Sequence, residues 1–159
     1  MKINLRARNS KVLVIGDAML DAYWMGNVSR ISPEAPVPVL AVNRKTTVAG
    51  GAANVALNCS SLGASVELIA VVGADSAAQD LQNCLTQSGI VNLALVADTN
   101  RPTTVKTRIV AAGQQIVRID EEKSEPVECD TEAQLIKHAL VALNNKPSVV
   151  VISDYGKGV

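Results

Sequence analysis

The sequence predicts an α/β fold in which helices flank a mostly parallel sheet and a small second β layer lies at its edge. Four apolar runs are hydrophobic on both faces, as strands inside a parallel sheet are: residues 12–15, 66–72, 91–96 and 148–152. Helix-like spacing of apolar residues alternates with these runs, which favours parallel pairing. Two segments, near 35–49 and 103–120, alternate as hairpins do and supply the second layer.

The first hairpin follows a proline-rich segment that excludes a helix and interrupts any central strand (Pro33, Pro36 and Pro38). Residues 37–42 alternate as an edge strand does, residues 43–45 form a polar turn, and residues 46–48 begin the return strand. The second hairpin has strands at 103–110 and 115–120 around a turn. An acidic loop over 121–130 follows it and is expected to be solvated surface.

Three helices are predicted from the spacing of apolar residues. The first begins at Gly50-Gly51 and ends at Gly63, and the second runs from Ser76, its expected cap, to Ser88. A capping box over 131–134 begins the third helix. Its buried stripe is expected to contain Leu135, Ile136, Ala139, Leu140 and Leu143.

Composition excludes several classes of function. Hydrophobic residues make up 48% and charged residues 19% of the 159 residues, so the chain is not disordered. Its net charge of zero attracts neither nucleic acid nor an anionic membrane, and no such partner is expected. The first apolar run is too short for a signal peptide or a membrane span. Three cysteines without a CxxC pair and a single histidine exclude a zinc site of usual spacing and indicate a cytoplasmic protein with reduced thiols.

The last predicted strand runs to Ile152, and only residues 153–159 follow it. Ligands of open α/β sheets bind beyond the carboxyl ends of the strands. The chain therefore stops inside an expected active-site loop, with no helix to cover the last strand, and we expect a domain whose C-terminal half is absent.

Several residues at these strand ends can carry chemistry. Asp17 and Asp21 follow the first strand, where carboxylates accept hydrogen bonds from hydroxyl groups or simply cap a polar loop. Gly50 and Gly51 let a ligand approach the backbone at a helix start, or form an ordinary tight turn, and Asn54 lies one turn later.

Cations recur at two of the predicted strands. Lys106 and Arg108 share the polar face of one strand and either bind a phosphate or form a solvated face. Lys157 lies beyond the last strand, where contact with a phosphate or a hydroxyl is natural. The only histidine, His138, is expected at the surface. Neither GxxxxGK[ST] nor a GxGxxG after a strand is present, so the sequence has no nucleotide phosphate loop of those kinds.

Five segments together resemble the ribokinase/PfkB family of sugar kinases: residues 14–21 (VIGDAMLD), 29–39 (SRISPEAPVPV), 50–56 (GGAANVA), 114–120 (QQIVRID) and 153–158 (SDYGKG). The SPEAPVP segment narrows the resemblance to the branch that phosphorylates heptose 7-phosphate, and the resemblance covers essentially the whole chain. It implies a ribokinase-like fold whose two hairpins form a lid over the sugar. It also implies pairing of lid strands between the subunits of a homodimer.

The resemblance implies that ATP, with Mg²⁺, phosphorylates the anomeric hydroxyl of heptose 7-phosphate, on the route to ADP-heptose for the lipopolysaccharide core. By this analogy the sugar hydroxyls are held by Asp21, Gly50, Gly51 and Asn54. The candidates for binding the phosphate of the sugar are Lys106, Arg108 and Lys157.

One family motif has no counterpart in these residues. The catalytic base of the family is an aspartate in a Gly-Ala-Gly-Asp type motif, which belongs to the second half of the domain together with most of the ATP site. No catalytic residue is therefore assigned to the 159 residues, and much of the ATP and Mg²⁺ site is expected outside them. The alternative is an inactive fragment that acts at most as a sugar-phosphate-binding or dimerising module.

Overall fold

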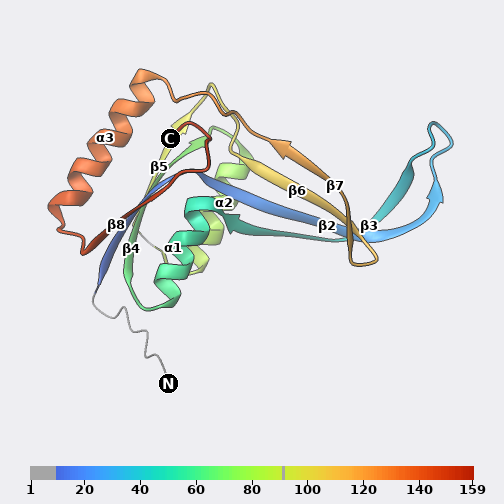
Figure 1. Ribbon diagram of the computed structural model, residues 1–159, viewed down its shortest axis with the longest axis horizontal. Helices are drawn as coiled ribbons and strands as arrows, with labels where there is room; N and C mark the ends of the chain where they lie inside the picture. The colour runs from blue at the N-terminus through green and yellow to red at the C-terminus, as the bar shows by residue number, and fades with distance from the viewer. Residues whose placement is uncertain (1–9, 91) are drawn as a thin grey trace.

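The computed structural model describes residues 10–90 and 92–159, which form two four-stranded sheets and three helices (Figure 1). In chain order the elements are β1 (Lys11–Gly16), β2 (Ala18–Ile31), β3 (Pro38–Gly50), α1 (Gly51–Ser61), β4 (Ser65–Gly73), α2 (Ser76–Gln87), β5 (Asn92–Asp98), β6 (Val105–Ala111), β7 (Gln114–Glu121), α3 (Cys129–Asn144) and β8 (Val149–Ser153). The first residue of the strand expected over 91–96 lies outside the described residues. The predicted α/β class is confirmed.

The main sheet has the strand order β5-β4-β1-β8, and all of its strands are parallel. Alternate residues of β1 and β4 enter two separate cores, because successive side chains of a strand point to opposite faces. Val14 and Leu68 pack with α1 and α2, whereas Leu13 and Ile69 pack with Leu135 of α3. Helices on both faces thus bury β1 and β4, as their continuous apolar runs predict.

The second sheet has the order β3-β2-β6-β7 and projects to one side of the main sheet (Figure 1). The β2–β3 and β6–β7 pairs are antiparallel hairpins, and β2 pairs with β6 in parallel. Leu20 of β2 and Ala49 of β3 are buried in the core that α1 and α2 share with the main sheet. The predicted second layer of two hairpins is confirmed, with β3 at its edge.

The first hairpin differs from its prediction. Its first strand is the 14-residue β2, which was not predicted, and its turn lies at residues 32–37, where Ser32 N–H donates to the Val37 carbonyl at 2.9 Å. Asn43, Arg44 and Lys45 were expected in a turn but lie inside β3, where a register shift occurs beside Met25. Polar residues on an exposed edge strand resemble a turn, and only cross-strand pairing distinguishes the two.

The helix starts also need correction. Asp75 rather than Ser76 caps α2, since its Oδ1 accepts from Ala78 N–H at 2.9 Å. The capping box predicted at Thr131 is wrong, because α3 begins at Cys129 and no side chain caps it. Thr131 is instead buried on the inner face of the helix.

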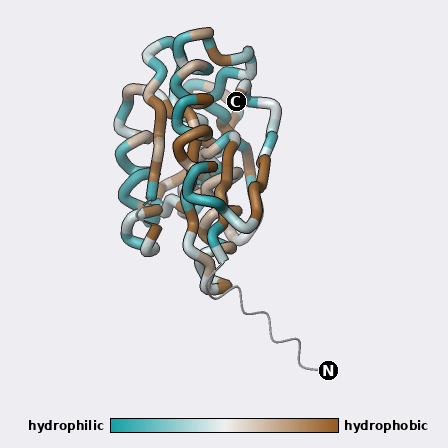
Figure 2. The backbone as a smooth tube through the Cα atoms, turned by 90° about the vertical axis from the view of Figure 1, so that its left-hand side faces the viewer, coloured by the Kyte–Doolittle hydropathy of each residue, from teal (hydrophilic) through white to brown (hydrophobic). Residues whose placement is uncertain are grey.

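Only part of the predicted stripe on α3 is buried. Leu135 is buried and Ala139 is partly buried against the main sheet, whereas Ile136, Leu140 and Leu143 are about half exposed. Ala142, which the prediction did not include, is buried on the same face. The apolar residues of α3 occupy a wider arc than one sheet face covers. Figure 2 views the backbone from this side and colours its hydrophobic stretches brown. His138 is exposed, as expected. Within the described residues, no helix is both long enough and apolar enough to cross a membrane.

Candidate functional site

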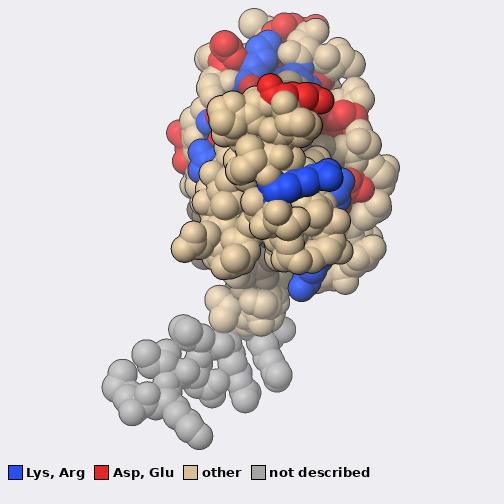
Figure 3. All heavy atoms as spheres, turned by 90° about the vertical axis from the view of Figure 1, so that its right-hand side faces the viewer, with Lys and Arg blue, Asp and Glu red and all other residues tan. Residues whose placement is uncertain are grey.

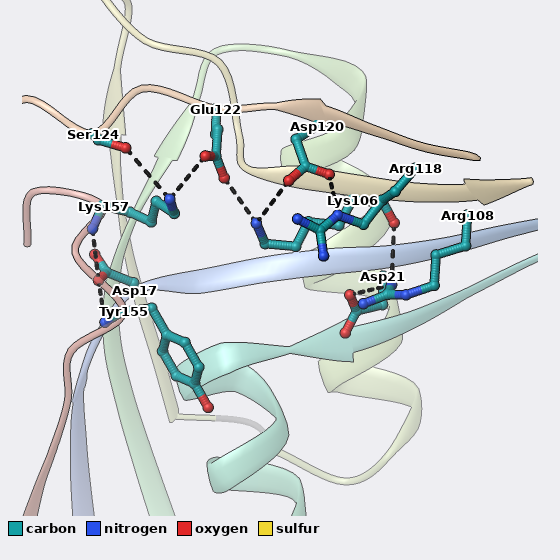
Figure 4. A network of polar contacts seen from close by, with 10 residues as sticks. All are labelled: Asp17, Asp21, Lys106, Arg108, Arg118, Asp120, Glu122, Ser124, Tyr155 and Lys157. Carbon is teal, nitrogen blue, oxygen red and sulfur yellow. Dashed lines mark hydrogen bonds and ion pairs between the residues drawn. The ribbon is translucent and has the colours of Figure 1, made fainter. Parts of the chain in front are cut away.

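The candidate site lies where the second sheet meets the carboxyl end of β8. Cross-strand pairing places Asp21, Lys106 and Asp120 side by side across β2, β6 and β7. The next row on the same face, two residues along each strand, contains Tyr23, Arg108 and Arg118. One face of the second sheet is therefore lined with charged side chains, and the loop after β8 lies beside it (Figure 4).

Asp21 and Arg108 form the ion pair at one end of this face. Arg108 Nη1 donates to Asp21 Oδ1 at 2.6 Å, and each side chain is about one-fifth exposed. The hydrogen bond to Asp21 raises the pKa of Arg108, so the guanidinium stays charged. The guanidinium carbon also lies 5.2 Å from the centre of the Tyr23 ring. Asp21 was expected in a loop but lies inside β2, which fixes its direction.

Gly50 and Gly51 bring the start of α1 against the same aspartates. A Cβ on Gly50 would lie 2.5 Å from Asp21 Oδ2, so only glycine leaves room beside this carboxylate. Gly51 has a φ of +55°, and the following amide, Ala52 N–H, donates to the Asp17 carbonyl at 2.9 Å. The Ala52 amide is therefore bonded within the protein and is not free for a ligand. Asn54 is exposed one turn into α1, and among the described residues it takes no part in the ion pairs of this face.

Lys106 and Lys157 meet at Glu122. Lys106 Nζ lies 2.8 Å from Glu122 Oε2 and 3.3 Å from Asp120 Oδ2. Lys157 Nζ lies 2.8 Å from Glu122 Oε1 and 3.4 Å from Ser124 Oγ. These contacts raise the pKa of Lys106, chiefly through Glu122, and the two lysines lower the pKa of Glu122. The carboxylate therefore bridges a strand of the second sheet and the loop after β8.

We call seven charged side chains around this face the charge network: Asp21, Lys106, Arg108, Arg118, Asp120, Glu122 and Lys157. Ion pairs link the last four with Lys106, whereas the Asp21–Arg108 pair adjoins them only through Arg108 Nη1, which donates to the Lys106 carbonyl at 3.4 Å. Sequence reasoning missed three of them. Glu122 was assigned to solvated surface, yet its side chain is only 24% exposed and accepts from two lysines. The alternation of Arg118, Asp120 and Glu122 at every second residue was the signal for a shared face.

The charge network suits a polar ligand that carries both hydroxyl groups and a negative charge. Its three carboxylates accept hydrogen bonds from hydroxyl groups, and its four cations attract an anion. No set of three His, Cys, Asp or Glu side chains that could hold a metal ion occurs within residues 10–90 and 92–159.

Comparison with known proteins gives consistent results. The model of the pfkB family carbohydrate kinases matches residues 9–155. A D-beta-D-heptose 7-phosphate kinase of Bordetella bronchiseptica is 46% identical over 97% of this chain and 48% of its own length. The bifunctional protein HldE of Azorhizobium caulinodans is 52% identical over 93% of this chain and 31% of its own length. The chain thus spans at most about half the length of these relatives.

Solved structures share the fold at low sequence identity. A carbohydrate kinase from Agrobacterium tumefaciens superposes with a TM-score of 0.67 at 22% identity, over 90% of this chain and 45% of the other. An Arabidopsis thaliana ribokinase complexed with ribose and ATP gives 0.61 at 18% identity, over 90% of this chain and 45% of its own. The ribokinase-like arrangement of the main sheet, helices and second sheet is therefore confirmed. With a family match over almost all of its residues, the chain belongs to the pfkB family of carbohydrate kinases.

Proposed function

We propose that this chain carries the sugar-binding part of an ATP-dependent kinase that phosphorylates the anomeric hydroxyl of heptose 7-phosphate, for ADP-heptose and lipopolysaccharide core synthesis. The charge network carries the proposal, because it joins hydroxyl acceptors and anion-binding groups on one surface. The relatives named as heptose 7-phosphate kinase and HldE support the choice of sugar.

The sugar hydroxyls are assigned to the Asp21 end of the network. Asp21 Oδ2 lies beside Gly50, where the absence of a side chain leaves the backbone accessible to a ligand. Gly51 brings the start of α1 to the same place, and exposed Asn54 can contribute an amide. Since Arg108 binds Oδ1, the second oxygen of Asp21 remains the hydroxyl acceptor.

The phosphate of the sugar is assigned to Lys106, Arg108 and Lys157. All three cations are paired with carboxylates in the structure, so an incoming phosphate must compete with Asp21, Asp120 and Glu122. The phosphate of the sugar is a dianion, whereas each carboxylate carries a single negative charge. Its stronger attraction to the cations favours replacement of the carboxylates by the phosphate. We propose the second sheet as the lid that excludes water from the reacting hydroxyl.

We propose ATP with Mg²⁺ as the phosphoryl donor, since the family consists of carbohydrate kinases and a solved ribokinase of this fold holds ATP. The 159 residues contain no Gly-Ala-Gly-Asp motif, and the described residues offer no metal-binding cluster. No chemical step is therefore assigned to them. A reaction that uses ATP and a sugar phosphate also suits the cytoplasm.

Sugar binding by the 159-residue chain tests the proposal. Asp21→Ala should weaken the binding of heptose 7-phosphate and of unphosphorylated heptose alike, by about 10- to 100-fold, because a charged acceptor of hydroxyl groups is lost. Arg108→Ala should weaken only the phosphorylated sugar. Isothermal titration calorimetry measures both, with Lys45→Ala as the control because Lys45 lies over Trp24 outside the charge network.

Equal losses for both sugars in Arg108→Ala, or intact binding in Asp21→Ala, would show that these residues are placed wrongly. The alternative, a sugar-phosphate-binding or dimerising module without activity, predicts the same binding. It differs in turnover, because phosphorylation of heptose 7-phosphate by the purified 159-residue chain would exclude it.

We also propose that the second sheet forms a homodimer contact. The β2–β3 hairpin extends beyond the other strands as a two-stranded arm and exposes Val28, Ile31, Val37 and Val42. Figure 3 looks onto this end of the molecule, where most of the surface carries no charged side chain. Exposed apolar side chains on unpaired strand edges favour pairing with a second copy. Val28→Lys should shift sedimentation from dimer towards monomer, and an unchanged dimer would place the contact elsewhere.

A further inference from the structure

We propose that Asp17 and Arg101 are positioning residues that hold the backbone of Lys157 from both sides and thereby direct its ammonium group to Glu122. The ligand of Lys157 is taken from the proposed function. The positioning of Lys157 is inferred from the contacts of the loop that follows β8, residues 154–159.

Asp17 is the buried acceptor for this loop. Asp17 is 2% exposed and lies directly after β1. Oδ2 accepts from Tyr155 N–H at 2.7 Å and from Lys157 N–H at 3.0 Å (Figure 4). Oδ1 accepts from Val159 N–H at 3.3 Å. Every second amide of the loop therefore points to one carboxylate.

Two glycines give the loop this shape. Gly156 and Gly158 have φ values of +66° and +93°, a backbone region that other residues rarely adopt. They alternate with Tyr155, Lys157 and Val159, so that the amides of these three residues turn to the same side. Backbone concavities of this kind bind anions, and here the anion is a side chain of the protein.

No ion pair to Asp17 occurs within residues 10–90 and 92–159, so its carboxylate depends on these amides. A buried carboxylate is costly unless it is hydrogen-bonded. Any movement of the 154–159 loop away from the sheet would therefore leave Asp17 without its donors. The loop conformation and the buried charge stabilise each other.

Arg101 holds the same residue from the opposite side. Its side chain is 6% exposed and is anchored by Nε, 3.2 Å from Asp98 Oδ2. Nη1 donates to the Lys157 carbonyl at 2.8 Å, and Nη2 donates to the Glu125 carbonyl at 3.0 Å. One guanidinium group thus joins the loop that carries Lys157 to the segment that begins at Glu122.

Lys157 is consequently fixed at its amide by Asp17 and at its carbonyl by Arg101. A lysine side chain has considerable rotamer freedom, which an ion pair alone orders at a cost. With the backbone of Lys157 fixed, and with the same arginine bonded to the Glu125 carbonyl in the segment that follows Glu122, the ammonium meets Glu122 at 2.8 Å. Neither Asp17 nor Arg101 belongs to the charge network, so both act through Lys157.

The test compares two lysines that share one carboxylate. In the 159-residue chain, Asp17→Asn removes the charge that the three amides face but keeps the size of the side chain. We expect amide hydrogen exchange at Tyr155, Lys157 and Val159 to accelerate by about 10- to 100-fold, as loss of a hydrogen bond to a charged group predicts. In ¹⁵N-detected NMR, the ammonium signal of Lys157 should be lost while that of Lys106 persists.

The matched control is Asp154→Asn, since Asp154 lies in the same loop and accepts only the local amide of Gly156, at 2.7 Å, among the described residues. Both ammonium signals should persist in it. Retention of the Lys157 signal in Asp17→Asn would overturn the proposal. Loss of both lysine signals together would also overturn it, because Asp17 would then support the fold as a whole.

Arg101→Lys provides a second test that does not depend on the folding of the first variant. A lysine can keep the ion pair to Asp98 but cannot hold two carbonyl groups with a planar fork. The Lys157 ammonium signal should again be lost selectively, and its persistence would contradict the role of Arg101. None of these measurements uses a sugar, so their failure is distinguishable from failure of the proposed kinase function.

Discussion

The strands β4 and β8 pair with the two sides of β1, both in parallel, and both are mostly apolar in sequence. Their surroundings nevertheless differ. Every residue of β4 from 68 to 73 is buried, whereas Val149, Val150 and Ile152 of β8 are 51%, 43% and 67% exposed. An apolar run on both faces therefore predicts a strand of a parallel sheet but not its burial.

The neighbours explain the difference. β4 lies between β1 and β5, with α1 and α2 on one face and α3 on the other, whereas β8 is the edge strand of the main sheet and pairs only with β1 among the described residues. On α3, Leu140 and Val141 are also exposed. The chain spans at most about half the length of the two relatives named above.

The largest expected effect is on the β4 side. Leu68→Ala should lower the free energy of unfolding by about 2–5 kcal/mol, because Leu68 is fully buried and its truncation leaves a cavity. Ile152→Ala should change it by less than about 0.5 kcal/mol, since that side chain lies mostly in solvent. Urea unfolding measures both, and similar losses in the two variants would mean that β8 is buried in solution.

A smaller effect is expected at the carboxyl end of β4, which Asp75 ties to Thr103. Asp75 accepts from Thr103 N–H at 2.8 Å and from Thr103 Oγ1 at 2.7 Å, besides capping α2. Asp75→Asn should cost about 1 kcal/mol at neutral pH, because an amide has one acceptor oxygen and no charge, so a hydrogen bond from Thr103 is lost. Burial raises the pKa of Asp75, but the hydrogen bonds from Thr103 and Ala78 outweigh it, so the pKa is lowered in the folded chain.

The sign of the pH dependence follows from that direction. A carboxyl group with a lowered folded-state pKa contributes stability above its unfolded pKa of about 3.9, and this contribution is lost as the pH falls through the folded-state value. The difference between wild type and Asp75→Asn should therefore be constant above about pH 5 and shrink in more acidic solution. Unfolding midpoints measured from pH 7 to pH 3 check this, and a difference that grows on acidification would contradict it.

A charge placed on the exposed face of β8 should change the stability least. It should, however, clearly change the self-association of the chain. An unpaired apolar strand edge favours aggregation, so the chain alone should bind hydrophobic dyes and associate. Ile152→Lys should reduce both effects while changing the free energy of unfolding by less than about 0.5 kcal/mol. Dye fluorescence and sedimentation measure this against Gln134→Lys, an exposed polar position on α3, and a dye-free monomeric wild type would refute it.

Much of the site followed from sequence because its residues lie at ends of predicted strands or alternate along them. Lys106 and Arg108 were placed on one face by their spacing, and the structure pairs Arg108 with Asp21 and brings Lys106 and Lys157 together at Glu122. Glu122 was missed, since its loop composition resembles solvated surface. Its role depends on a lysine 35 residues away in sequence.

The sequence by itself determined those helices, strands and turns that are specified by residues close together in the chain. Apolar runs specify β1 and β4, and the helical spacing between Gly51 and Gly63 specifies α1. The turn of the β6–β7 hairpin is likewise local, with positive φ at Ala112 and Gly113. Such features are encoded by neighbouring side chains and backbone preferences, which the printed sequence contains directly.

Only the tertiary structure decided which surfaces of these elements meet. The register of β3 on the unpredicted β2 moved the expected turn from residues 43–45 to 32–37, and packing on one sheet face selected Leu135 over Leu140 for burial. Asp17 acquired its role from amides about 140 residues later in the chain. These outcomes depend on contacts between segments that are distant in the chain. A local sequence pattern does not predict them, because the same apolar or charged residue is stable in several local structures.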